Sequence, residues 1–279
     1  MGLIVAQYIG HPFLHLNHKA THLLLQVSVV GLGFGMNMGN AYKVGKEGFM
    51  FTVISIATTL AIGLLLGRVL KIDKKTAYLI SSGTAICGGS AIAAISPVIK
   101  AEEKQISVAL GTIFILNSFA LFLFPLIGGL LHLSQTQFGL WCALAIHDTS
   151  SVVGAASKYG NTALEVATTV KLARALWILP LAIISSFVFK NKNSKLKIPY
   201  FIVFFIAAML INTYLPILRT LNHTITIISK SGLTLTLFLI GSGLSKQVLL
   251  SVGFKPLLQG LVLWLLISVF TLLVILHFN

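Results

Sequence analysis

Long apolar segments recur along the whole chain, and short polar connections separate them. Roughly 20 apolar residues are enough for a helix to cross the hydrocarbon of a bilayer. Charged residues make up only 9% of the chain, against roughly 25% in a soluble domain, too few to cover a surface in water. The pattern therefore predicts an all-α polytopic membrane protein, a single transmembrane domain over residues 1–279 with about nine to ten transmembrane helices. The segments are Thr21–Met38, Phe49–Val69, Thr76–Ile99, Ile106–His132, Phe138–Tyr159, Thr162–Phe189, Ile198–Tyr214, Thr224–Leu244 and Lys255–Phe278.

The basic residues lie mostly between these segments. The net charge is +14, and many Lys and Arg residues fall in clusters at 68–75, 100–104 and 190–197. Loops that flank membrane helices carry such clusters, whereas nucleic-acid binding needs a basic face on a folded domain. We therefore expect the lipid bilayer, and no nucleic acid, as a partner.

The opening residues Met1–Ile9 are apolar but too short to cross a bilayer as a regular helix. They lack the basic region and the cleavage site of a signal peptide. Either they are the end of a hydrophobic segment, so that the natural protein begins further upstream, or they form a short interfacial helix.

Polar residues and glycines interrupt two of the segments. Thr76–Ile99 carries the run Gly83–Ser90, and Phe138–Tyr159 carries His147–Ser151. Glycine loosens a helix, and clustered hydroxyls offer the backbone other partners. Such backbone is tolerated at membrane depth where it is buried in protein or lines a cavity, and it indicates a transporter binding site. Close helix packing is the alternative for the glycines. We predict two adjacent breaks and a substrate site formed by Gly83, Thr84, Cys87, Gly88, Gly89, Ser90, Thr149, Ser150 and Arg174.

A short motif occurs twice. Gly33-Phe34-Gly35-Met36 precedes Val44-Gly45 by the same spacing that separates Gly241-Ser242-Gly243-Leu244 from Val252-Gly253. An apolar segment follows each unit, and the number of segments between them gives the units opposite orientations. This arrangement predicts inverted repeats, although short apolar motifs also match by chance.

Among the ionisable residues of the predicted segments, we single out four that lie well inside two of them: His147, Asp148, Lys171 and Arg174. Each costs at least about 2.5 kcal/mol at membrane depth, so we predict a function for them. Asp148 could hold a proton or a sodium ion, and His147 could titrate near neutral pH. Lys171 and Arg174 share a helix face and need a partner, either Asp148 or a bound anion. Lys171 could instead extend to an interface. The predicted ion-coupling residues are His147, Asp148 and Lys171.

The chain carries no motif of a known catalytic site. Gly-x-Ser-x-Gly, His-Glu-x-x-His and P-loop patterns are absent. Cys87 and Cys142 lie in apolar segments without disulfide or zinc spacing. We therefore expect no enzyme, no cofactor and no metal site.

Several strings together resemble the YeiH family of bacterial inner-membrane proteins, which carry the label of sulfate exporters. They are the run Gly83–Ile92, His147-Asp148, Lys171–Arg174 leading to Pro180, and Gly253–Leu258. The family is related to the bile acid–sodium symporters and the cation–proton antiporters. The resemblance implies inverted repeats and two discontinuous crossing helices. Relatives usually carry Glu where this chain has Asp148, and they begin with a further hydrophobic segment.

We therefore expect a secondary transporter of a small anion, sulfate-like or organic, coupled to protons or sodium. Helix ends and Arg174 would neutralise the anion, and Asp148 with His147 would provide the coupling. The expected location is the bacterial inner membrane, with a homodimer as a possible assembly. Two alternatives stay open: a cation–proton antiporter in which Asp148 binds the cation, and a membrane sensor or accessory protein that binds a ligand without moving it.

Overall fold

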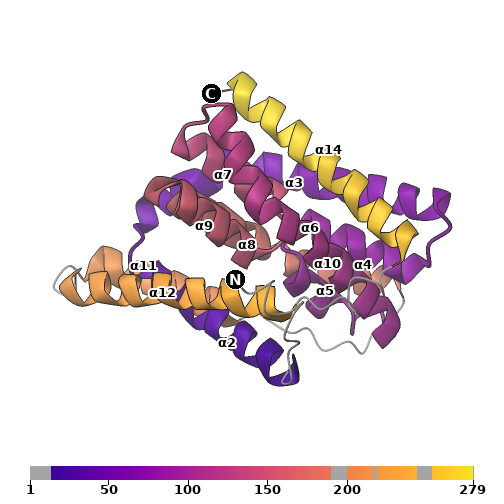
Figure 1. Ribbon diagram of the computed structural model, residues 1–279, viewed down its shortest axis with the longest axis horizontal. Helices are drawn as coiled ribbons and strands as arrows, with labels where there is room; N and C mark the ends of the chain where they lie inside the picture. Colours follow the sequence, from indigo (N-terminus) through magenta and orange to yellow (C-terminus); the bar gives the residue numbers. More distant parts are fainter. Residues whose placement is uncertain (1–13, 190–199, 216–218, 244–252, 279) are drawn as a thin grey trace. The chain divides into compact units, whose positions relative to one another are not determined.

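The computed structural model describes residues 14–189, 200–215, 219–243 and 253–278, and every regular element in these ranges is an α-helix (Figure 1). The opening segment Met1–Ile9 lies outside them. The helices are α2 (Leu14–Gly33), α3 (Met38–Val69), α4 (Lys74–Ala85), α5 (Gly89–Ile95), α6 (Glu103–Leu130), α7 (Gln135–Ala145), α8 (Thr149–Tyr159), α9 (Asn161–Ala175), α10 (Ile178–Val188), α11 (Tyr200–Tyr214), α12 (Arg219–Gly243) and α14 (Phe254–Phe278). The predicted all-α class is confirmed. In the described ranges, α2 and α3 begin earlier than the sequence predicted.

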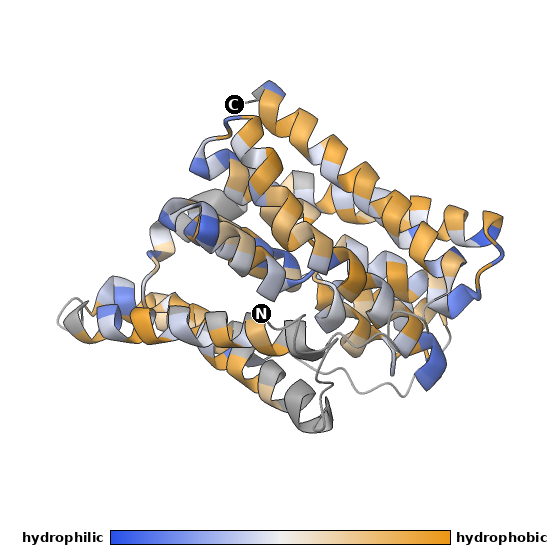
Figure 2. Ribbon diagram, in the orientation of Figure 1, coloured by the Kyte–Doolittle hydropathy of each residue, from blue (hydrophilic) through white to orange (hydrophobic). Residues whose placement is uncertain are grey.

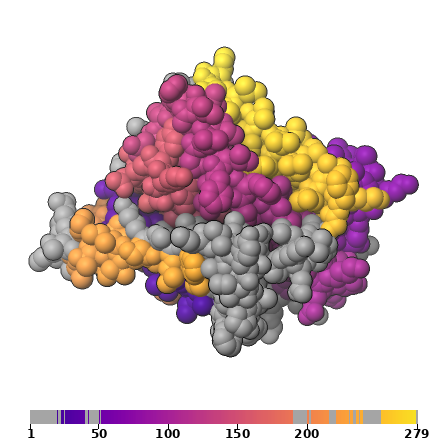
Figure 3. Space-filling view, viewed as in Figure 1, coloured from indigo at the N-terminus to yellow at the C-terminus, as the bar shows by residue number. Residues whose placement is uncertain are grey.

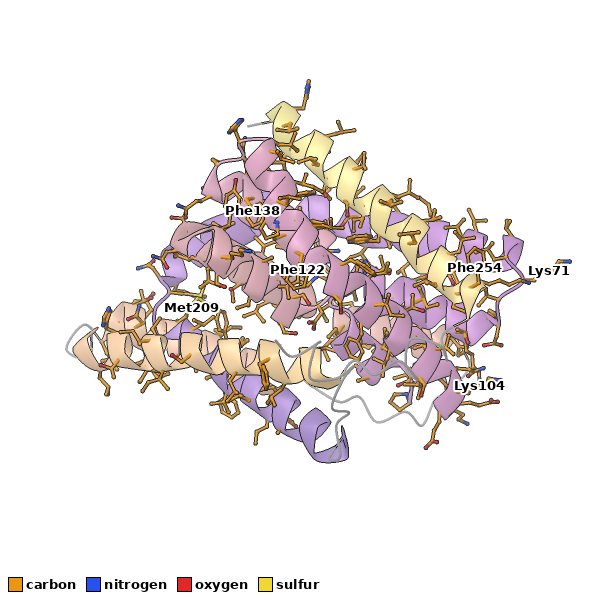
Figure 4. All side chains as sticks on the ribbon, in the orientation of Figure 1. Lys71, Lys104, Phe122, Phe138, Met209 and Phe254 are labelled. Atoms are coloured by element: carbon orange, nitrogen blue, oxygen red, sulfur yellow. The ribbon has the colours of Figure 1, made fainter. Side chains whose placement is uncertain are left out.

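Within the described part of the chain, four stretches are both long and apolar enough to cross a membrane. They are Thr52–Val69, Glu103–Leu130, Asn161–Val188 and Phe254–His277. Most residues of α14 are apolar, as the hydropathy colours of Figure 2 show. Phe122 is 60% exposed and Phe254 is 76% exposed (Figure 4), and the face in Figure 3 shows α14 open along its length. Apolar faces of this extent fit a lipid environment.

Contacts between residues divide the chain into two compact units. The smaller unit contains residues 1–46 and 199–249, and the larger unit contains residues 47–198 and 250–279.

In the smaller unit, α2 packs against α11 and α12. A Cβ atom at Gly33, the last residue of α2, would lie 2.7 Å from the carbonyl oxygen of Phe205 in α11. Only glycine therefore allows the two backbones to approach so closely. The connection from α2 to α3 is held by α11, because Asn212 Nδ2 donates to the Met36 carbonyl at 3.0 Å and Met38 N–H donates to Thr213 Oγ1 at 2.9 Å.

The proposed counterpart of the Gly33–Gly45 unit begins at Gly241, near the end of α12. Residues 244–252 of that counterpart lie outside the described ranges. The inverted repeat therefore stays a prediction.

In the larger unit, α14 packs against α4, α6 and α7. Trp141 of α7 donates from Nε1 to the Ser268 carbonyl of α14 at 2.9 Å, and its ring stacks on Phe124 of α6 with centroids 4.2 Å apart. Phe138, labelled in Figure 4, stacks on Tyr159 of α8 with centroids 3.7 Å apart. These aromatic contacts hold α7 and α8 in place on either side of the connection between them.

The apolar stretch Asn161–Val188 is not one unbroken helix, because a turn at Leu176 and Trp177 separates α9 from α10. Pro180, in the first turn of α10, has no N–H to donate, and its ring would clash with the Leu176 carbonyl in a continuous helix. The chain instead tightens, and Trp177 N–H donates to the Arg174 carbonyl at 3.0 Å.

Candidate functional site

The first predicted break lies between α4 and α5, at Ile86–Gly88. Gly88 adopts φ +61° and ψ −123°, a conformation that side chains other than glycine rarely accept. Its N–H donates back to the Gly83 carbonyl at 2.8 Å, which closes the end of α4. The prediction of distorted backbone within Gly83–Ser90 is confirmed.

The second predicted break lies between α7 and α8, at Ile146–Asp148. His147 N–H has left the helical pattern and donates to Asn117 Oδ1 of α6 at 3.2 Å. Asp148 is the N-cap of α8, and its side chain accepts from Ser151 N–H at 3.2 Å. The prediction of distorted backbone at His147–Ser151 is also confirmed.

The two breaks touch. A Cβ atom at Gly88 would lie 3.3 Å from both the carbonyl carbon and the carbonyl oxygen of His147. Gly88, in the turn between α4 and α5, therefore contacts His147, in the turn between α7 and α8. The predicted adjacency of the breaks is confirmed, and residues some sixty positions apart meet inside the larger unit.

Lys171 and Arg174 of α9 bind the carboxyl ends of the broken helices. Lys171 Nζ donates to the Ile146 carbonyl at 2.6 Å and to the Ala143 carbonyl at 3.3 Å. Arg174 donates from Nη1 to the Leu144 carbonyl at 2.7 Å and from Nη2 to the Ala85 carbonyl, the last residue of α4. Cations at this end of a helix are favourable because the unpaired carbonyls there carry partial negative charge.

Both cations are fully buried, with an exposed fraction of 0%. The alternative in which Lys171 extends to a membrane interface is therefore wrong. Their hydrogen-bond partners are neutral carbonyl groups, so the positive charges are oriented without being cancelled.

The carboxylate of Asp148 is bound within its own turn and not by the cations. It accepts from the Ser150 hydroxyl and from Ser151 Oγ, the latter at 3.3 Å. The side chain is half-buried. Among the acidic side chains that the structure describes, Asp148 is the one at the breaks. Asp73, Glu102 and Glu103 precede or begin helices, and Glu165 lies six residues before Lys171 on α9.

Several buried polar atoms around the breaks lack a hydrogen-bond partner in the described structure. They are Thr84 Oγ1, Asn117 Nδ2, both ring nitrogens of His147, and Arg174 Nε. All four residues are at most 3% exposed. A buried polar group without a partner costs about 1–3 kcal/mol. Asn117 is hydrogen-bonded to His147, and Arg174 to Ala85, the residue after Thr84. These four residues therefore lie at or beside the breaks, and their unpaired atoms indicate places where a ligand or water completes the bonding.

The other predicted substrate residues lie at or beside the breaks, in different roles. Gly83 lies inside α4, where a Cβ atom would come within 3.0–3.3 Å of Ile92 and Ile113, so close packing explains it. Cys87 is a buried free thiol within the first break. Gly89 and Ser90 begin α5, and Thr149, Ser150 and Ser151 form the buried first turn of α8.

Asn117 was not among the predicted substrate or coupling residues; the sequence predicts for it only a contact between helices. It lies in α6, far from both motifs in sequence, and its amide binds the main chain of the second break. The available signal was a lone amide in a long charge-free segment, because such a group needs a partner in a membrane.

The fold and site thus define an integral membrane protein with two touching broken helices and a buried pair of cations. The chain belongs to the family described as conserved hypothetical protein 698, which it matches over residues 11–274. It is 58% identical over 274 residues to the UPF0324 membrane protein of Bacteroides thetaiotaomicron, covering 98% of this chain and 83% of that relative. It is 54% identical to that of Porphyromonas gingivalis, covering 99% and 85%, and 50% identical to that of Shewanella oneidensis, covering 93% and 82%. No solved structure matches the chain.

Proposed function

We propose that this protein is a secondary active transporter of a small anion in the inner membrane of a bacterium. The observation that carries the proposal is the fully buried pair Lys171 and Arg174, which contacts both broken helices without an ionised partner. A buried charge is costly unless something compensates it. A bound anion would compensate it, and an anion that leaves on either side of the membrane is a transported substrate.

The broken helices support the same proposal. Discontinuous helices that meet inside a membrane protein form the substrate sites of many secondary transporters. The wider architecture follows from the family resemblance: nine to ten transmembrane helices, inverted repeats and crossing of the two broken helices. In this proposal the protein moves by an elevator-like or rocking mechanism, Asp148 and His147 couple the anion to protons or sodium, and two copies pair as a homodimer.

A cation–proton antiporter is the second candidate, and one observation favours it. All the hydrogen bonds that the structure shows from Lys171 and Arg174 go to carbonyls at helix ends, where the cations offset partial negative charge. If that were their whole role, Asp148 would be free to bind a transported cation. The unpaired donors Arg174 Nε and Asn117 Nδ2 favour the anion instead, because a cation offers nothing for them to bind.

The experiment is tracer flux into liposomes that contain the purified full chain. A panel of radiolabelled inorganic and organic anions is offered with a proton gradient, a sodium gradient or neither. The anion transporter is expected to accumulate an anion only with the gradient that it uses. Binding of anions without any flux would support the sensor alternative, and sodium- or potassium-driven proton movement without anion flux would support the antiporter.

Asp148→Asn tests the coupling. The amide keeps the shape of the side chain and loses the titrating group, so we expect gradient-driven accumulation to fall to the level of empty liposomes. The matched control is Glu165→Gln, which removes the same charge from α9 away from the breaks and should accumulate the anion normally. If Asp148→Asn accumulates anion normally at every pH, the carboxylate is structural and the proton-coupling proposal is wrong.

A further inference from the structure

The net charge of the side chains at the breaks constrains the charge of the anion that binds there. When Lys171 and Arg174 are both protonated they contribute two positive charges, and ionised Asp148 contributes one negative charge. Two helix carboxyl ends and two amino ends meet there, and their partial charges are of similar size and opposite sign. A third cation buried beside these two would be costly, so the imidazole of His147 counts as neutral. The sum is one positive charge.

The unpaired atoms indicate which hydrogen-bonding groups the ligand must carry. Arg174 Nε and Asn117 Nδ2 are donors, and the Thr84 hydroxyl can donate as well. They come from three different helices, α9, α6 and α4. A ligand that satisfies them needs at least two acceptor atoms, as an oxyanion or a carboxylate has. Neutral His147 adds a donor on one nitrogen and an acceptor on the other, so a protonated oxygen on the ligand also has a partner.

We propose that the anion is a small oxyanion or carboxylate with a single negative charge, and that Asp148 sets this charge preference. The inference rests on the proposed function, since it concerns the substrate of the same site. A doubly charged anion leaves one negative charge uncompensated in a buried place, and a neutral ligand leaves one positive charge. Removing the carboxylate of Asp148 raises the sum to two positive charges and moves the preference toward doubly charged anions.

The test measures binding, so that it is separate from coupled flux. Thermal unfolding of the purified full chain in detergent is followed in formate, nitrate and hydrogen carbonate, and in sulfate and oxalate, at one ionic strength set with chloride. A ligand that binds the folded state raises the unfolding temperature with concentration, and the dependence gives its affinity. For the natural sequence we expect at least one singly charged anion to bind roughly tenfold or more tightly than either doubly charged one.

In Asp148→Asn we expect the preference to reverse, so that sulfate or oxalate binds roughly tenfold or more tightly than the singly charged anions. Glu165→Gln removes an equal charge away from the breaks and should leave the ratio unchanged. If Asp148→Asn fails to fold, Asp148→Ser keeps an N-cap oxygen for α8, removes the charge and should show the same reversal.

The outcomes separate the inference from the function on which it rests. If the natural sequence binds sulfate or oxalate more tightly and still transports an anion, the proposed charge preference is wrong and the proposed transport function stands. If the natural sequence shows the expected binding preference but no flux, the proposed transport function is wrong and the anion-binding site stands. A shift of the same size in Glu165→Gln shows that overall charge, and not Asp148, sets the preference. Absence of binding and of flux for every anion overturns both.

Discussion

Gly88→Ala perturbs the point where the two breaks touch. The alanine must adopt φ +61° and ψ −123°, which glycine accepts and residues with a Cβ atom rarely do. Forcing a residue into such a conformation costs about 1–3 kcal/mol. The new methyl group would also lie 3.2 Å from Ile113 Cγ2 and 3.3 Å from the His147 carbonyl, closer than ordinary contact. We therefore expect a loss of at least about 1–3 kcal/mol in the free energy of unfolding.

The neighbouring glycine provides a matched control. A Cβ atom at Gly89 would meet Leu110 and Phe114 at 3.5–3.6 Å, which is ordinary van der Waals contact. Gly89 is also the first residue of α5, where alanine is the better helix former. Gly89→Ala should therefore be neutral or slightly stabilising.

The assay is reversible unfolding of both variants in mixed micelles with increasing sodium dodecyl sulfate, followed by circular dichroism. The reasoning requires Gly88→Ala to unfold at clearly lower detergent fraction than Gly89→Ala. If the two variants unfold together with the natural sequence, then neither the backbone conformation of Gly88 nor its contact with His147 constrains the site.

Two further predictions concern the buried polar groups. Lys171→Met leaves the Ala143 and Ile146 carbonyls without their donor, which costs about 1–3 kcal/mol for each group. It also removes the cost of burying the ammonium charge, so the free energy of unfolding should fall by less than the sum of about 2–6 kcal/mol. The exposed Lys158→Met is the control, and equal losses in the same unfolding assay would contradict the carbonyl contacts. Asn117→Asp keeps the acceptor for His147 N–H but replaces the free amide donor with a negative oxygen. It should remain folded and weaken anion affinity roughly tenfold or more, as seen by thermal shift; unchanged affinity would remove Asn117 from the site.

The sequence located both breaks because their cause is local. The turn at Ile86–Gly88 depends on Gly88, and the turn at Ile146–Asp148 depends on an N-cap that Asp148 provides. Glycine conformation and helix capping depend on only a few neighbouring residues, so the residue types at these positions predict where the helices break. The interruption between α9 and α10 also has a local contribution, because Pro180 in the first turn of α10 has no N–H to donate.

The partners of Lys171 and Arg174 were not predictable in the same way. A search for counter-ions in the sequence finds Asp148, yet the structure gives these side chains the carbonyls of Ala85, Leu144 and their neighbours. Every residue carries a carbonyl, so no side-chain pattern marks the ones that a broken helix leaves unpaired. The partner of Asn117 was not predictable for a related reason, because it is the main-chain N–H of His147.

The attachment of both helix ends to α9 limits how the site can move. One guanidinium group, that of Arg174, holds the last carbonyl of α4 and a carbonyl in the last turn of α7. A movement that separated these helices would strand either the cation or a carbonyl in a medium without water, at a cost of several kcal/mol. The two broken helices and α9 should therefore move together as one body during any transport cycle. Access to the anion would then change by movement of this body relative to other helices, which is what an elevator-like or rocking mechanism requires.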